Sequence, residues 1–91
     1  MENTGLVQIL VVEDEQLIQA LVEDALSEGG FKPVLAQTGE EAAELLQEAV
    51  KYAALITDVN LPGSIDGWEV AKRAREAHPQ MPVIYMYWGI N

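Results

Sequence analysis

The feature that most constrains the fold is a short apolar run at residues 53–57 (AALIT), which ends on Asp58 and breaks soon afterwards at Pro62-Gly63. The run offers apolar side chains to both faces, as a parallel strand covered by helices on both sides does. A lone acid at the carboxyl end of such a strand lies where open α/β sheets bind their ligands. Because Asp also commonly begins a turn, Asp58 taken alone fits a turn and a functional site equally well.

A second run of the same kind, residues 6–12 (LVQILVV), is followed at once by Glu13, Asp14 and a further glutamate. It is rich in apolar and β-branched residues and predicts a first buried strand. Apolar residues then recur at helical spacing over 15–28, and the two glycines that follow give the helix its C-terminal stop. This part of the chain therefore predicts a strand that delivers acids to the start of an amphipathic helix.

The rest of the chain continues the alternation of strands and helices. Residues 31–36 predict an edge strand, because Pro33 cannot donate a hydrogen bond to a sheet ladder. Two more helices and a fourth strand are predicted at 38–50, 67–78 and 83–87. The order β-α-β-α-β-α-β implies right-handed crossovers and a parallel α/β sheet with helices on both faces. For such a sheet we adopt the flavodoxin-like, doubly wound arrangement with strand order 2-1-3-4.

Length and composition limit what the chain can be. Its 91 residues form a single small domain, of which the polar residues 1–5 are expected to be a disordered leader. The absence of cysteine excludes disulfides and thiolate zinc sites, and a single histidine excludes a multi-histidine metal site. No segment resembles a membrane span or a signal peptide, so a cytoplasmic location is expected. A net charge of −10 argues against direct binding of nucleic acid.

Three isolated residues have structural interpretations. Trp68, at the start of the third predicted helix, is expected to pack under that helix as a core residue. His78 near its C-terminus is favourably placed against the helix dipole. Asp66 has the spacing of a helix cap, with a glutamate three residues later.

The predicted topology brings three acids together. In the order 2-1-3-4 the first and third strands are neighbours, so Glu13, Asp14 and Asp58 converge at one edge of the sheet. Carboxylates packed together repel one another unless a cation lies among them, and Mg²⁺ prefers such oxygen ligands. The alternative is that Glu13 and Asp14 only complement the dipole of the first helix. That alternative explains two of the acids and leaves the third without a reason.

Three motifs resemble the receiver domain of two-component response regulators, in the right order and across nearly the whole chain from Val7 to Met86. They are Ile9–Glu15, Asp58–Gly63 with Asp66-Gly67 following, and Pro82–Met86. The resemblance implies a phospho-acceptor that is not an enzyme beyond self-phosphorylation and dephosphorylation with Mg²⁺.

The resemblance also implies a role for each residue of the site. Asp58 would accept a phosphoryl group from a histidine kinase or a phosphotransfer protein. Asp14 and Asp58 would hold Mg²⁺ directly, together with the backbone carbonyl of Asn60, and Glu13 would assist through a water molecule. Phosphoryl transfer needs an in-line nucleophile and neutralisation of charge on the phosphoryl oxygens, which these residues would provide.

Two family features, both parts of the switch, differ here. Tyr87 occupies the position of a serine or threonine that binds the phosphoryl group, and a phenol is too long to make the same inward movement. The phosphate-binding lysine of the family follows a fifth strand that this sequence does not contain. Lys51 is expected at the opposite edge of the sheet and Lys72 on the third helix, so neither replaces it. We therefore expect the acceptor to be intact and its switch output to be impaired.

A sheet that stops at its fourth strand has further consequences. Strand 83–87 is expected to be an open, apolar edge with unpaired backbone groups, and one side of the first helix is expected to be uncovered. Both features predict a homodimer formed through that edge or by exchange of elements, and otherwise aggregation.

Two other functions are weighed against a phospho-acceptor. A degenerate receiver would act as a protein-interaction module and never carry phosphate, as the missing lysine and Tyr87 would allow. A magnesium-dependent phosphohydrolase with an aspartyl nucleophile is disfavoured. Such enzymes usually carry a second acid two residues after the nucleophile, where this chain has Asn60, and no general acid is evident.

Overall fold

The computed structural model describes residues 6–87, so the predicted leader at residues 1–5 lies outside the described residues. Four strands and three helices alternate along the chain as predicted. Their bounds are β1 Val7–Val12, α1 Gln16–Glu28, β2 Phe31–Ala36, α2 Gly39–Leu46, β3 Ala54–Asp58, α3 Gly67–Ala77 and β4 Val83–Met86. None of the helices in this described part is both long and apolar enough to span a bilayer.

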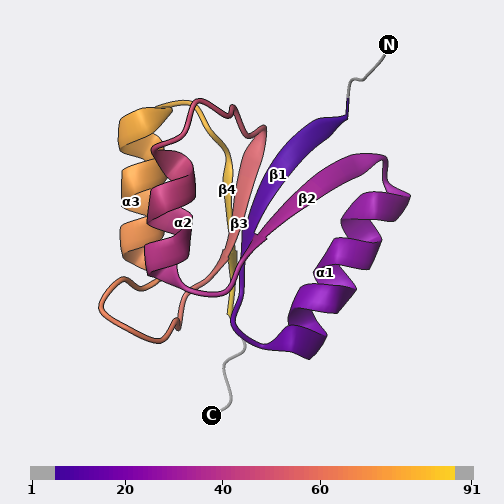
Figure 1. Ribbon diagram of the computed structural model, residues 1–91, viewed down its shortest axis with the longest axis horizontal. Helices are drawn as coiled ribbons and strands as arrows, with labels where there is room; N and C mark the ends of the chain where they lie inside the picture. The colour runs from indigo at the N-terminus through magenta and orange to yellow at the C-terminus, as the bar shows by residue number, and fades with distance from the viewer. Residues whose placement is uncertain (1–5, 88–91) are drawn as a thin grey trace.

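The four strands form one parallel sheet in the order β2-β1-β3-β4, which confirms the predicted topology. Helices α2 and α3 cover one face and α1 lies on the other (Figure 1). The position of Pro33 in an edge strand is also confirmed, since among the described strands β2 pairs with β1 alone. All strands end on the same edge of the sheet, here called the carboxyl rim, where β1 leads into α1 and β3 leads towards α3.

The core lies between the sheet and the two helices α2 and α3. Leu10, Leu55 and Val70 are fully buried there, together with small alanines of both helices. Helix α1 buries none of its residues, and Leu17 and Leu21 are largely exposed. One side of α1 is therefore uncovered, as the sequence predicted.

Two predictions about the helices were wrong. Helix α2 ends at Leu46 rather than near Val50, because the N–H groups of Gln47 and Glu48 bond three residues back in a tightened final turn. Trp68 is 56% exposed instead of buried, because the inward positions of α3 are taken by Val70 and other small residues. Its indole packs on the ring of Tyr85, with the ring centroids 4.7 Å apart.

Candidate functional site

The predicted acids meet at the carboxyl rim. Val12 of β1 lies opposite Thr57 of β3 in the parallel ladder, so the next residues, Glu13 and Asp58, emerge side by side. Glu13 and Asp58 are buried, whereas Asp14 is exposed. One carboxylate oxygen from each of the three acids lies within 4.8 Å of the others. The arrangement is a compact group of oxygen ligands with one side open to solvent.

Glu13 is held by the start of α1 and by the neighbouring strand. Its Oε2 accepts a hydrogen bond from the N–H of Glu15 at 2.9 Å. Its own N–H donates to the carbonyl of Ala36 at 3.0 Å, and its carbonyl accepts from Nε2 of Gln19 at 3.1 Å. Glu13 is therefore fixed by both its main chain and its carboxylate.

Asp58 is oriented by the loop that follows it. Its Oδ1 accepts a hydrogen bond from the N–H of Asn60 at 3.1 Å. Its carbonyl accepts from Oγ1 of Thr57 at 3.0 Å. The same carbonyl lies so close to Gly67 that a Cβ there would be 2.0 Å from it. Only glycine at the start of α3 allows this approach, so the helix start and the end of β3 at Asp58 are positioned together.

The loop between β3 and α3 also contacts the first turn of α2. The N–H and the hydroxyl of Ser64 both donate to Oε2 of Glu40, each at 2.9 Å. These hydrogen bonds hold the pKa of the Glu40 carboxyl below its ordinary value. Sequence reasoning missed Glu40, because no local pattern indicates a contact between residues 24 positions apart.

Tyr87 borders the carboxyl rim, whereas Lys51 and Lys72 lie on other parts of the fold. Tyr87 follows Met86, the ladder partner of Asp58, and is 71% exposed. Lys51 lies at the opposite edge of the sheet, where it helps to line a pocket of about 370 Å³. Lys72 is exposed on α3. Within residues 6–87, neither lysine is therefore placed as a partner for a group bound at Asp58.

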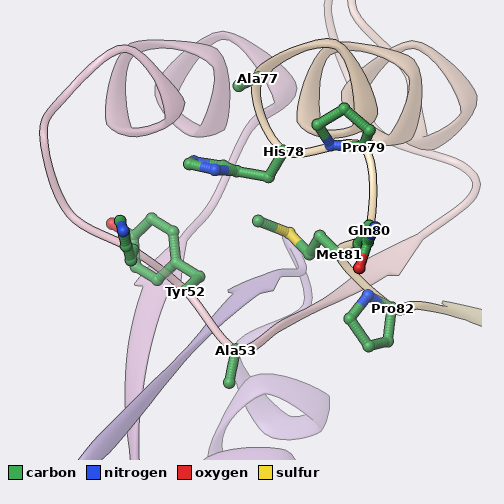
Figure 2. Close-up of a pocket in the computed structure, with 9 residues that line it drawn as sticks. Tyr52, Ala53, Ala77, His78, Pro79, Gln80, Met81 and Pro82 are labelled. Atoms are coloured by element: carbon green, nitrogen blue, oxygen red, sulfur yellow. The ribbon is translucent and has the colours of Figure 1, made fainter.

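The pocket at the opposite edge is bordered by Tyr52, His78 and Met81, which Figure 2 shows facing one another. Tyr52 is buried, and its burial, with the nearby charge of Glu48, raises the pKa of the phenol. The pocket shares none of its lining residues with the acids of the carboxyl rim.

Known proteins resemble this chain in sequence and in fold. The family model described as response regulator receiver domain matches residues 9–87. The transcriptional regulatory protein AfsQ1 of Streptomyces coelicolor is 36% identical over 78 residues, which are 86% of this chain and 33% of that protein. The transcriptional regulatory protein TcrA of Mycobacterium tuberculosis is 40% identical over 80 residues, 88% of this chain and 31% of that protein. The chain thus spans about a third of the length of these curated relatives.

Two solved structures that match this chain are also response regulator proteins. A response regulator receiver protein from Sinorhizobium medicae superposes with a TM-score of 0.88 at 32% identity, covering 91% of this chain and 67% of that one. The response regulator protein TrrA from Thermotoga maritima, solved in complex with Mg²⁺-BeF, gives a TM-score of 0.78 at 34% identity. That match covers 90% of this chain and 70% of the other.

Proposed function

The chain belongs to the response regulator receiver domain family, and on this premise we propose that Asp58 accepts a phosphoryl group in a two-component phosphorelay. Receiver domains interact with histidine kinases or phosphotransfer proteins and are generally not classical enzymes. The donor would be a phosphohistidine on such a partner. The transcriptional roles named for the relatives concern proteins of which this chain spans about a third, so the proposal is limited to the receiver step.

In the proposed reaction the phosphorus atom of the donor must reach a carboxylate oxygen of Asp58 that is already held in position. A carboxylate oxygen of Asp58 attacks the phosphorus atom, and the phosphorus–nitrogen bond of the phosphohistidine breaks. The imidazole leaves with the electron pair of that bond and takes up a proton. The hydrogen bond from Asn60 to Oδ1 holds the Asp58 carboxylate in one orientation before the donor arrives, which reduces the cost of reaching a productive geometry.

The acids at the carboxyl rim have the chemistry of a magnesium site. Asp14 and Asp58 would hold Mg²⁺ with the backbone carbonyl of Asn60, and Glu13 would act through a water molecule. The ion supplies neutralisation of the charge on the phosphoryl oxygens. The relative TrrA, at 34% identity, was solved with Mg²⁺-BeF, which supports the same cofactor here.

The single observation that carries the proposal is the meeting of Glu13, Asp14 and Asp58, whose carboxylate oxygens lie within 4.8 Å of one another. Three negative charges at this separation are costly without a counter-ion. The rim also offers Asp14 as an exposed ligand beside the buried Asp58. A purely structural role for the acids, as helix caps, accounts for Glu13 and Asp14 but gives no reason for Asp58 to join them.

The test is phosphorylation by a small-molecule donor. The protein is incubated with Mg²⁺ and acetyl phosphate, and its intact mass is measured. We expect one phosphoryl group on the wild-type chain and on the control Asp24→Asn, which removes an exposed acid of α1. We expect none on Asp58→Asn. A wild-type chain that gains no mass at any donor concentration, although it is folded, would contradict the proposal.

That negative result would favour the second candidate, a protein-interaction module that does not carry phosphate. The exposed phenol of Tyr87 favours it, because it stands where the family has the hydroxyl that binds the phosphoryl group. If Asp58 is phosphorylated, Tyr87 at this position instead makes the switch output weak.

We also infer that this chain forms a homodimer through β4 or by exchange of elements. Within residues 6–87, β4 pairs with β3 alone, and Ile84 in its middle is 54% exposed. Open apolar edge strands tend to pair with another copy. Sedimentation velocity should give a dimer, which Ile84→Lys should weaken and the control Gln47→Lys, on an exposed residue after α2, should not. A strictly monomeric wild-type chain would contradict this.

Location and partners outside the relay stay proposals as well. A net charge of −10 disfavours direct contact with a nucleic acid backbone. A receiver whose phosphohistidine donor is a kinase or phosphotransfer protein would act in the cytoplasm. Fractionation of cells that produce the chain, followed by immunodetection, would test the location.

A further inference from the structure

One contact near the acids is not used by the proposed reaction: the pair of hydrogen bonds between Glu40 and Ser64. Glu40 lies in the first turn of α2, and Ser64 lies in the loop between β3 and α3. Both the N–H and the hydroxyl of Ser64 donate to the same carboxylate oxygen, each at 2.9 Å. Hydrogen bonds to a charged group are among the stronger ones in proteins. We call this contact the loop clasp.

The backbone around the loop clasp is shaped to allow it. Gly63 has φ +88°, a left-handed conformation that other residues rarely adopt, and a Cβ there would lie 2.9 Å from both carboxylate oxygens of Glu40. Gly39, at the start of α2, is so close to the loop that a Cβ would lie 2.1 Å from the carbonyl of Ile65. Glycines on both sides thus bring the loop against the helix end, as the path of the chain in Figure 1 also shows.

The loop clasp acts on the segment that carries Asn60. The segment leaves β3 at Asp58 and is fixed there by the hydrogen bond from Asn60 to the carboxylate. It enters α3 at Asp66, whose Oδ1 accepts from the N–H of Glu69 at 2.9 Å. Between these two points Leu61 and Ile65 are partly buried against the core, and the loop clasp adds the hydrogen bonds that tie Ser64 to the start of α2.

We propose that Glu40 is a positioning residue for the metal site: through Ser64 it holds the loop so that the carbonyl of Asn60 is preset beside Asp14 and Asp58. The inference rests on the proposed function, because it concerns the Mg²⁺ that the acids would bind. A loop that is already ordered does not lose conformational entropy when the ion binds. A loop released from Glu40 must become ordered when the ion binds, so the affinity of the metal site for magnesium falls.

The test is magnesium affinity, measured by isothermal titration calorimetry on the full chain. We expect Glu40→Ala to weaken binding by about threefold to tenfold, at or below the lower end of what supporting contacts around metal ligands usually contribute. Ser64→Ala, which carries no charge change and keeps the N–H donor, should weaken it less. The control Glu44→Gln removes one negative charge from an exposed position of the same helix and should leave the affinity near that of the wild type.

Two further variants separate positioning from a general loss of structure. Glu40→Gln keeps an oxygen that can accept from Ser64 and should restore part of the lost affinity. The double variant Glu40→Ala with Ser64→Ala should bind no more weakly than Glu40→Ala, since both changes remove one contact. If Glu40→Ala does not fold, Ser64→Ala against Glu44→Gln carries the test.

The results distinguish this inference from the proposed function. A wild-type chain that binds no magnesium and gains no phosphoryl group contradicts both. If the folded Glu40→Ala and Ser64→Ala variants bind magnesium as tightly as the wild-type chain, the result contradicts only the proposed role of the loop clasp in positioning Asn60. Weakening in Glu44→Gln equal to that in Glu40→Ala would assign the effect to net charge and also contradict the loop clasp.

Discussion

Thr57 lies opposite Val12 in the parallel ladder between β3 and β1, and this register sets Asp58 beside Glu13 at the carboxyl rim. The acids therefore meet because two strands that are distant in sequence are neighbours in the sheet. A shift of the register by one residue would turn every side chain of β3 to the opposite face. The buried Leu55 and Thr57 and the intermediate Ile56 of β3 fix the register against such a shift.

The first prediction concerns the stabilisation of the fold by magnesium. A ligand that binds only the folded state at about 100 times its Kd raises the free energy of unfolding by about 2.7 kcal/mol. We expect a gain of this size for the wild-type chain in chemical denaturation with Mg²⁺. Asp14→Asn should lose most of it, because Asp14 would be the exposed ligand of the proposed site. Equal stabilisation of both proteins by Mg²⁺ would show that Asp14 does not bind the ion.

The second prediction concerns the glycine at the start of α3. A Cβ at Gly67 would lie 2.0 Å from the carbonyl oxygen of Asp58, so Gly67→Ala must push the helix start and the strand end apart. We expect a loss of about 1–3 kcal/mol of unfolding free energy, the usual cost of overpacking. Gly29→Ala is the control, because a Cβ there meets its nearest atoms at 3.4 Å, an ordinary contact.

Gly67→Ala should also reduce phosphorylation of Asp58 in the fraction that stays folded, because the main chain of Asp58 moves and carries the carboxylate with it. Urea denaturation and the intact-mass assay check the two effects separately. A variant with wild-type stability would show that α3 shifts at no cost and that the close approach does not fix the acceptor.

The third prediction concerns the pH dependence of the loop clasp. Hydrogen bonds from Ser64 lower the pKa of the Glu40 carboxyl from its ordinary value of 4.5. A lowered pKa means that the folded state favours the charged carboxylate. The contribution to stability is therefore present above pH 4.5 and is lost as the pH falls through the lowered pKa.

Carbon-detected NMR of the Glu40 carboxyl should give a titration midpoint below 4.5 in the wild-type chain. In Ser64→Ala the midpoint should move upwards, because one of the donors is lost. Glu44, on the same helix, serves as the internal reference in both samples. An unchanged midpoint in Ser64→Ala would show that the serine hydroxyl does not hold the carboxylate.

Much of the fold could be predicted from the sequence, because the strands are marked by strong local patterns. The apolar runs before Glu13 and Asp58 identified β1 and β3, and Pro33 identified the edge strand. The alternation of strands and helices predicted a parallel sheet, and the doubly wound strand order 2-1-3-4 then made β1 and β3 neighbours and brought the acids together. These inferences needed periodicity, the handedness of crossovers and the strand order of a doubly wound sheet.

The rest depends on contacts that local patterns do not encode. Trp68 was expected in the core because large aromatic residues at helix starts usually pack there. Its burial depends on which face of α3 packs inwards, and Trp68 does not lie on that face. The apolar residues after Leu46 continued the helical pattern of α2 although the helix ends there. The contact of Glu40 with Ser64 required knowing where a loop folds in space.

The most direct test of the central claim is the position of the phosphoryl group. After treatment with acetyl phosphate and Mg²⁺, borohydride reduces an aspartyl phosphate to homoserine, which peptide mass spectrometry locates. We expect homoserine at position 58 and at no other acidic position of the chain. Homoserine at Asp14 or Asp66, or a phosphoryl group that survives in Asp58→Asn, would contradict the assignment of Asp58 as the acceptor.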